Sequence, residues 1–279
     1  AGRKCDGYAE LDPESLAREQ GVAESAGQDT WEQARAAKDF AMFAPSLKRL
    51  VELAREEAKL VAGDGNAYDA LLDLYEPGAT EAELIPLFDG LVAELSPIVK
   101  AVADSGVTVD EAPARGNYPA EAQLAFGRRV AEQMGFDFSA GRIDRAAHPF
   151  CSGFGAQDVR ITWRWLDDDF RSALYGIMHE AGHGLYEQGL PERWNRTPIG
   201  LAASLGVHES QSRMWENLVG RSRAFWDWAM PLFQEHFPEK RGLSADELWP
   251  TLHTVKPSYI RVEADQGTYD LHIAVRFDV

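Results

Sequence analysis

The clearest strand pattern in this chain is a single short segment, and helical spacing dominates most of the remainder. In DVRITWRW (158–165), the apolar residues Val159, Ile161, Trp163 and Trp165 alternate with polar ones, as in a strand with one buried face. Elsewhere, apolar residues recur three and four positions apart, as on the buried face of a helix. The sequence therefore predicts a mainly α fold with a small β component.

Capping motifs mark where several of these helices begin. In a capping box, Ser or Thr is followed three residues later by Glu or Gln, and the pair satisfies free backbone N–H groups of the first turn. The pattern occurs at Thr30 with Gln33, at Thr80 with Glu83, and at Ser244 with Glu247. We expect the first helix to follow Thr30, with a restart or kink at Pro45, and a later helix to run from Pro119 to Gly135.

The net charge of −17 limits the classes of partner. A surface of this sign repels nucleic acid and anionic membranes, and no basic stripe overrides it. No run of about 18 apolar residues is present, and the N-terminus shows no apolar signal segment. Only Cys5 and Cys151 occur, so a disulfide framework is not expected. We predict a cytoplasmic protein without nucleic-acid or membrane partners.

The motif that carries chemistry is HEAGH, in a segment of helical spacing from about residue 168 to residue 188. Because His179 and His183 are four positions apart, they lie on one face of a helix and can bind the same Zn²⁺ ion. The Glu180 carboxylate lies beside that face, where it can take a proton from a water molecule that the metal activates. Two helical histidines with ordinary hydrogen bonds are the alternative.

A catalytic zinc site needs a third protein ligand and one open position. The segment VHESQ (207–211) offers two candidates, in a further predicted helix that covers about residues 208–228. Glu209 would give a His₂Glu ligand set, and His208 would give a His₃ set. The spacing of the residues alone leaves both possibilities open.

Several sequence blocks, in a fixed order, resemble the thermostable carboxypeptidase Taq family of metallocarboxypeptidases. They are HPF at 148–150, DVRIT at 158–162, HEAGHGLYEQG at 179–189, HESQSR at 208–213 and IRVEAD at 260–265, with further agreement in YDALLDLYEPG at 68–78 and GRIDRAAHPF at 141–150. Each block is weak by itself, whereas the ordered set is specific. The likeness extends from about Trp31 to the end of the sequence.

This resemblance implies a large helical metallopeptidase fold with a deep cleft and a small sheet at its edge. It implies a homodimer that removes single residues from the C-termini of peptides, with zinc as the usual metal and cobalt or manganese as alternatives. Carried over to this sequence, it assigns His179, His183 and Glu209 as metal ligands and Glu180 as the general base.

A carboxypeptidase also has to recognise the free carboxylate at the end of its substrate. The planar fork of an arginine side chain suits that group. Arg261, in the IRVEAD block, is the best candidate, and an ion pair with Glu263 or Asp265 is its alternative role.

Four other residues are expected near the cleft. His148 of the HPF block and the pair Asp158 and Arg160 are predicted to line it, with a loop anchor and a strand-edge ion pair as their alternatives. Glu187 follows His183 by four positions, so it shares the metal-binding face and could hold an imidazole in place.

The resemblance is incomplete at the ends of the sequence. Members of the family are longer and carry a later block, G-x-x-Q-D-x-H-W, which is absent here. We therefore expect a single partial catalytic domain over residues 1–279, lacking both ends of the family's chain but with an intact metal site. Two other functions remain open: a truncated protein that binds metal or peptide without turnover, and a helical zinc oligopeptidase.

Overall fold

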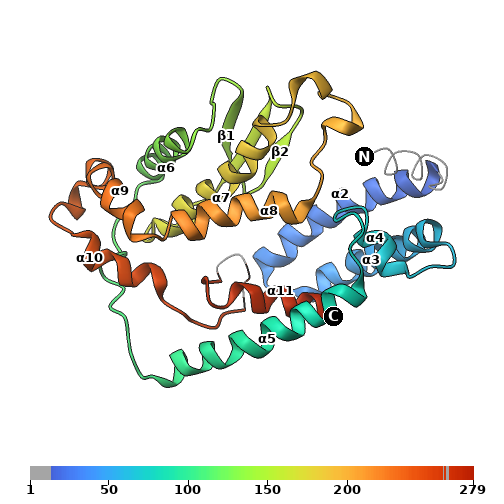
Figure 1. Cartoon of the computed structure of the whole chain (residues 1–279), viewed down its shortest axis with the longest axis horizontal. Coiled ribbons are helices and arrows are strands. Elements are labelled where there is room, and N and C mark those ends of the chain that lie inside the picture. Colours follow the sequence, from blue (N-terminus) through green and yellow to red (C-terminus); the bar gives the residue numbers. More distant parts are fainter. Residues whose placement is uncertain (1–13, 260, 262–263) are drawn as a thin grey trace. The chain divides into compact units, whose positions relative to one another are not determined.

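The computed structural model describes residues 14–259, 261 and 264–279. Cys5 and Glu263, named above, lie outside these residues. The chain divides into two compact units, residues 1–85 and residues 86–279. Figure 1 labels the helices and strands of both units.

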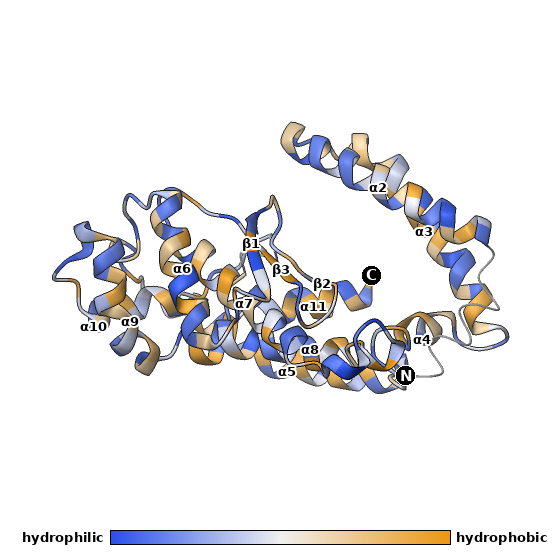
Figure 2. Ribbon diagram, turned by 90° about the horizontal axis from the view of Figure 1, so that it is seen from above, coloured by the Kyte–Doolittle hydropathy of each residue, from blue (hydrophilic) through white to orange (hydrophobic). Residues whose placement is uncertain are grey.

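A helical hairpin forms most of the first unit. Helices α2 (Glu14–Ala37) and α3 (Phe40–Ala62) pack against each other, and the short helix α4 (Ala67–Leu72) follows α3. Both long helices carry hydrophilic and hydrophobic residues along their length (Figure 2), as expected for helices with one buried face. At Gly27 the helices come so close that an added Cβ atom would lie 3.1 Å from the Leu50 side chain.

The predicted start of the first helix at Thr30 is wrong. Helix α2 begins at Glu14 and continues through Thr30, whose hydroxyl donates a hydrogen bond to the Ala26 carbonyl within the same helix. Packing of α2 on α3 compensates for the glycines in this segment, which are weak helix formers. The second helix also begins before Pro45, where the restart or kink was expected, and α3 runs through the proline. The Asp39 side chain caps α3 by accepting a hydrogen bond from the backbone N–H of Ala41.

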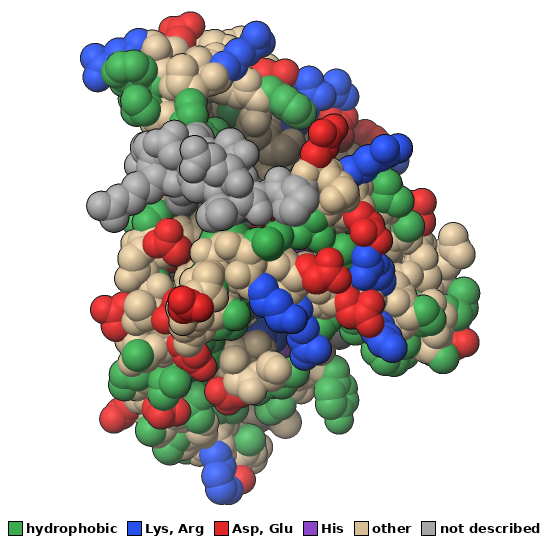
Figure 3. All heavy atoms as spheres, turned by 90° about the vertical axis from the view of Figure 1, so that its right-hand side faces the viewer, with side chains coloured by type: hydrophobic (Ala, Val, Ile, Leu, Met, Phe, Trp, Pro, Cys, Tyr) green, Lys and Arg blue, Asp and Glu red, His purple; other side chains and the backbone are tan. Residues whose placement is uncertain are grey.

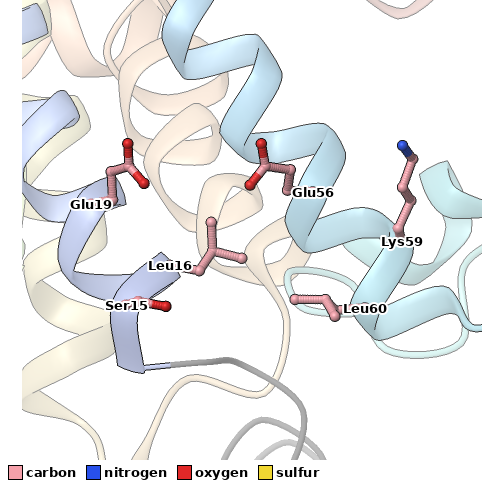
Figure 4. A pocket seen from close by; sticks show the side chains of 6 residues that line it. All are labelled: Ser15, Leu16, Glu19, Glu56, Lys59 and Leu60. Atoms are coloured by element: carbon pink, nitrogen blue, oxygen red, sulfur yellow. The ribbon is translucent and has the colours of Figure 1, made fainter.

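The hairpin has a hollow of about 370 Å³ near one end. Figure 4 shows Leu16 of α2 and Leu60 of α3 reaching into the space between the helices, with the carboxylates of Glu19 and Glu56 beside them. The two carboxylates come from opposite helices. Nothing in this hollow resembles the predicted metal-binding set.

The second unit contains the strands and the motif helix. Helix α5 (Glu81–Asp104) leads into it from the first unit. Its longer helices are α6 (Ala120–Met134), α7 (Arg171–Gln188), α8 (Leu205–Arg213), α9 (Arg223–His236) and α11 (Tyr269–Asp278). Its short helices are η1 (Glu192–Trp194), η2 (Pro198–Gly200), the π-helix η3 (Met214–Val219), η4 (Pro238–Lys240), α10 (Ala245–Leu248) and η5 (Trp249–His253).

A three-stranded sheet lies beside α7. Strands β1 (Gly141–Arg145) and β2 (Cys151–Gly153) flank β3 (Val159–Trp163), with β1 parallel and β2 antiparallel to it. The predicted strand is therefore present, although it ends two residues before Trp165. The mainly helical fold with a small sheet is confirmed.

Helix α7 is held between two hydrophobic cores. Ala173, Ile177 and Ala181 pack with the buried side chains of β3. Leu174 and Met178, on another face, pack in an aromatic core with residues of α6, α9 and α10. The helix that carries the HEAGH motif is therefore fixed on both sides.

Several other predicted boundaries are confirmed, and one more is wrong. The capping boxes at Thr80–Glu83 and Ser244–Glu247 are both formed. Helix α6 begins after Pro119 and ends at Gly135, which has a left-handed conformation. The single helix expected over residues 208–228 is instead α8, η3 and α9, because the chain turns between Gly220 and Ser222.

Within the described part of the chain, no helix is both long enough and apolar enough to cross a bilayer. On the face drawn in Figure 3, acidic, basic and hydrophobic side chains are interspersed rather than gathered by type.

Two glycines allow a test of how tightly α7 is packed. An added Cβ atom at Gly127 of α6 would lie 2.3 Å from Cδ1 of the buried Ile177, whereas one at Gly90 of α5 would meet nothing within 4 Å. We expect Gly127→Ala to lower the free energy of unfolding by about 1–3 kcal/mol through overpacking. Gly90→Ala should raise it by up to about 1 kcal/mol, because alanine is the better helix former.

Urea unfolding of the two variants measures these effects as shifts of the midpoint at constant slope. Equal shifts of the same sign in both variants would contradict tight packing of α6 on α7.

Candidate metal centre

Three side chains from α7 and α8 converge on one point. One ligand atom from each of His179, His183 and Glu209 lies within 4.8 Å of the other two. Glu209 Oε2 is 3.1 Å from Nε2 of His183 and 3.6 Å from Nε2 of His179. The structure thus brings together the two motif histidines and the glutamate that the resemblance assigned.

These distances fit a divalent metal with nitrogen and oxygen ligands. With bonds of about 2.0–2.1 Å, two ligands of a tetrahedral zinc site are about 3.4 Å apart. The spacings of 3.1 and 3.6 Å between Glu209 Oε2 and the two imidazole nitrogens bracket that value. The donor set, two imidazoles and a carboxylate, is also one that zinc accepts in catalytic sites.

The His179 ring is anchored by a carboxylate behind it. Its Nδ1 lies 2.9 Å from Glu216 Oε2, and Glu216 in turn accepts a hydrogen bond from Arg213 and lies 3.8 Å from Arg221. Burial by itself would lower the pKa of His179, but the hydrogen bond and charge of Glu216 raise it above its usual value. Such a partner fixes the ring and makes the free nitrogen a better ligand.

The His183 ring has a different partner. Its Nδ1 lies 2.6 Å from Nδ1 of His208, and Nε2 of His208 lies 2.8 Å from Glu187 Oε1. Both nitrogens of His208 are therefore occupied by protein groups, one by the outer nitrogen of His183 and the other by Glu187. Glu187, four residues after His183, contacts the imidazole of His208 rather than that of His183.

A glycine allows α7 and α8 to lie close together. A Cβ atom at Gly182 would lie 2.7 Å from Cα of Ser212 and 2.8 Å from the Gln211 carbonyl oxygen. Those contacts are with backbone atoms, which cannot rotate away. The close spacing of α7 and α8 therefore requires a residue without a side chain at position 182. This spacing lets Glu209 of α8 approach the two histidines of α7.

Glu180 is buried beside the three converging groups, with 6% of its surface exposed. Burial raises the pKa of Glu180, and with the opposing effect of His179 and the raising effects of Glu209 and Glu216 it reaches about 7. A carboxylate with that pKa can both accept and return a proton near neutral pH.

The carboxylate of Glu209 is kept ionised by its neighbours. Burial by itself would raise its pKa, but the hydrogen bonds of His183 and Ser212 and the charge of His179 hold the pKa of Glu209 at about 2. The Ser212 hydroxyl lies 3.0 Å from Oε2, and the Tyr269 hydroxyl donates to Oε1 at 3.2 Å. Glu209 can therefore act as an anionic ligand.

A cavity of about 480 Å³ opens beside these groups, and His179 and Glu180 form part of its wall. Its cationic lining residues are Arg115, Arg164, Arg171, Arg213, Arg221, Lys256 and Arg261, and its anionic ones are Glu111, Asp169, Glu180, Glu216 and Asp265. Cations thus outnumber anions in the wall, although the net charge of the chain is −17. This lining suits a substrate with a negative end.

Two of the predicted substrate-binding residues line this cavity and two do not. His148 and Arg261 are part of its wall, and Nη1 of Arg261 donates to the Tyr269 hydroxyl at 2.9 Å. Asp158 and Arg160 lie outside the lining and bond to each other through two hydrogen bonds of 2.9 Å at β3.

Asp265, the alternative ion-pair partner expected for Arg261, makes other hydrogen bonds. The Asp265 carboxylate accepts hydrogen bonds from backbone N–H groups of Lys256, Gly267 and Thr268. It holds the turn before α11, and Arg261 is hydrogen-bonded to the first residue of that helix.

Sequence reasoning missed three residues that shape the site. Arg213 and Glu216 follow Glu209 by four and seven positions, which is the spacing of one helix face, so their proximity could have been inferred. Tyr269 reaches Glu209 from sixty residues away, through tertiary structure alone. No spacing in the sequence indicates that contact.

Comparison with known proteins places the chain among metallopeptidases. The model of the carboxypeptidase Taq (M32) metallopeptidase family matches residues 7–279. Thermostable carboxypeptidase 1 of Thermus thermophilus is 45% identical over 276 residues, covering 96% of this chain and 54% of the relative. The chain spans about half the length of the curated relatives it matches.

Solved structures show the same likeness. An M32 carboxypeptidase from Deinococcus radiodurans R1 is 39% identical, with a TM-score of 0.85, over 96% of this chain and 54% of that one. A carboxypeptidase from Pyrococcus furiosus is 36% identical, with a TM-score of 0.87, over 98% of this chain and 55% of that one. With the match to the family model over nearly all of the sequence, this chain belongs to the carboxypeptidase Taq (M32) metallopeptidase family.

Proposed function

We propose that this chain carries the metal site of a zinc-dependent carboxypeptidase, which hydrolyses the last peptide bond of peptides with a free C-terminus. One observation carries the proposal: His179, His183 and Glu209 converge beside the buried carboxylate of Glu180, at the wall of an arginine-rich cavity. Membership of a metallopeptidase family supports it.

The proposed ligands are Nε2 of His179, Nε2 of His183 and the Glu209 carboxylate. Zinc is the metal that this set favours, with cobalt or manganese as alternatives. When bound, the metal acts as a Lewis acid that activates water and polarises the peptide carbonyl. Glu216 and His208 orient the two rings from behind.

Glu180 is the proposed general base. Its burial and its raised pKa suit a group that removes a proton from the attacking water and then passes it to the leaving amine. The same proton is taken and returned, so the carboxylate regains its starting state after each cycle.

Arg261 is the proposed partner of the substrate's terminal carboxylate. Its place in the cavity wall and the excess of cations around it support this role. We propose that His148 contributes to the same cavity, and that Asp158 and Arg160 belong to the substrate region through their strand. By the family likeness, we also propose that the whole protein acts as a homodimer.

A second function remains as an alternative, because the chain spans about 54% of its relatives. A partial site could bind metal or peptide without turning substrate over. An internal-cleaving helical oligopeptidase is the other alternative, and the substrate experiment below separates it from the proposal.

Replacing Glu180 and replacing Glu209 should have different effects on zinc binding. Glu180→Gln keeps the metal ligands and removes the base, so we expect zinc to remain bound while hydrolysis falls by about 10²–10⁴-fold. Glu209→Ala removes a ligand, so zinc should be lost. Zinc content by elemental analysis after gel filtration, together with peptide hydrolysis rates, tests both.

Ser210→Ala is a matched control in the same helix, because the Ser210 hydroxyl bonds to the Val207 carbonyl. It should keep both zinc and activity. Retained activity in Glu180→Gln would show that the base is another residue.

The form of the substrate's C-terminus should decide whether it is cleaved. We expect an N-blocked dipeptide with a free carboxylate to be hydrolysed and its C-terminal amide to resist, because the amide has no charge for an arginine to bind. Product release followed by chromatography measures both. Equal cleavage of the two would favour an oligopeptidase, and zinc binding without any cleavage would favour the non-catalytic alternative.

A further inference from the structure

The outer nitrogen of His183 begins a chain of hydrogen bonds that leads away from the metal site. His183 Nδ1 contacts His208 Nδ1 at 2.6 Å, and His208 Nε2 contacts Glu187 Oε1 at 2.8 Å. His208 is only 9% exposed, and the ring of Tyr186 packs on it with centroids 4.5 Å apart. His183, His208 and Glu187 therefore form a largely buried chain of hydrogen bonds, the relay, which extends behind one of the two ligand rings.

Metal binding fixes the direction of every hydrogen bond in this relay. For His183 Nε2 to offer its lone pair to a metal, the ring's proton has to lie on Nδ1. Nδ1 of His183 then donates to Nδ1 of His208, so the proton of His208 lies on Nε2 and is donated to the Glu187 carboxylate. Glu187 thus selects the tautomer of two rings in succession.

The two ligand rings are therefore held by different means. His179 is bonded directly to a carboxylate, that of Glu216. His183 reaches its carboxylate, Glu187, only through the imidazole of His208. The hydrogen-bond chain that orients His183 contains one more residue, so the orientation of this ring depends more on how firmly Glu187 is placed.

Strand β2 leaves a notch for that carboxylate. A Cβ atom at Gly153, the last residue of β2, would lie 2.8 Å from Oε2 of Glu187 and 3.4 Å from its Cδ. The atoms it would meet belong to the end of a flexible side chain, so the fold could absorb a Cβ atom. The Glu187 carboxylate, however, would have to move.

We propose that Glu187 and His208 are positioning residues that hold the His183 imidazole in its metal-binding tautomer and orientation, and that Gly153 of β2 makes room for Glu187 to do so. The inference rests on the metal site proposed above. This inference links the strength of metal binding to the sheet through Gly153, a residue outside the proposed ligand set.

The test is the zinc dissociation constant, measured by competition with a chromophoric chelator. We expect His208→Ala to weaken zinc binding by about 10–100-fold, the usual effect of losing an outer partner. Glu187→Gln and Gly153→Ala should each weaken it by up to about 10-fold. The double variant His208→Ala with Glu187→Gln should bind zinc no more weakly than His208→Ala alone, because Glu187 acts only through His208.

Ser152→Ala is the matched control for Gly153→Ala, because neighbouring residues of a strand point to opposite faces. It should leave zinc affinity unchanged. The visible spectrum of the Co²⁺ form gives a second readout: it should change in His208→Ala and not in Ser152→Ala. Urea midpoints of the metal-free proteins identify any variant that is unfolded, and Gly153→Ala carries the test if His208→Ala is.

The possible failures are distinguishable. Wild-type zinc affinity in His208→Ala, or additive losses in the double variant, would overturn the relay while leaving the proposed metal site intact. A wild-type chain without zinc affinity would overturn the proposed function and the relay together.

Discussion

The close approach of α7 and α8 is the constraint on which the site depends. Only a glycine at position 182 lets the backbone of Ser212 come this near, since a Cβ atom would lie 2.7 Å from its Cα. Glycine within a helix costs about 1 kcal/mol relative to alanine, so this spacing has a price in local stability. In return, one pair of helices supplies both motif histidines, the carboxylate of Glu209 and, at His208, the partner of one ring. A wider spacing would separate all of these contacts together.

Rigid packing on both sides of α7 complements that contact. One face packs on β3 and the other on the aromatic core of α6, α9 and α10. The cavity beside it has a charge balance of its own, with more cations than anions in its wall despite the net charge of −17. For recognition of a charged substrate, the groups around the site matter more than the total, because charges beyond about 8–10 Å are screened by salt.

Sequence alone predicted the parts of the site that follow from local periodicity. The spacing of His179 and His183 sets a common face, and Glu209 was one of two neighbours left open until the family likeness favoured it. Glu216 obeys the same helical rule and was overlooked. The contacts of Tyr269 and Gly153 were beyond reach, because they join segments that only tertiary folding brings together. In the fold, capping boxes at Thr80 and Ser244 were predicted, whereas the helix before Thr30 was missed because packing on α3 outweighs its poor local propensity.

The π-helix η3 sets the direction of the residues that follow α8. It spans Met214–Val219 and includes Glu216, the carboxylate behind His179. A π-helix accommodates an extra residue within an α-helical path. Deletion of one residue from this segment would let it relax into an ordinary α-helix and leave the later side chains facing as before, whereas deletion of one residue from the α-helical turns of α8 would turn each later side chain by about 100° around the axis. Along this path from α8 towards α9, η3 is therefore the segment in which the loss of one residue should least disturb the side chains that follow.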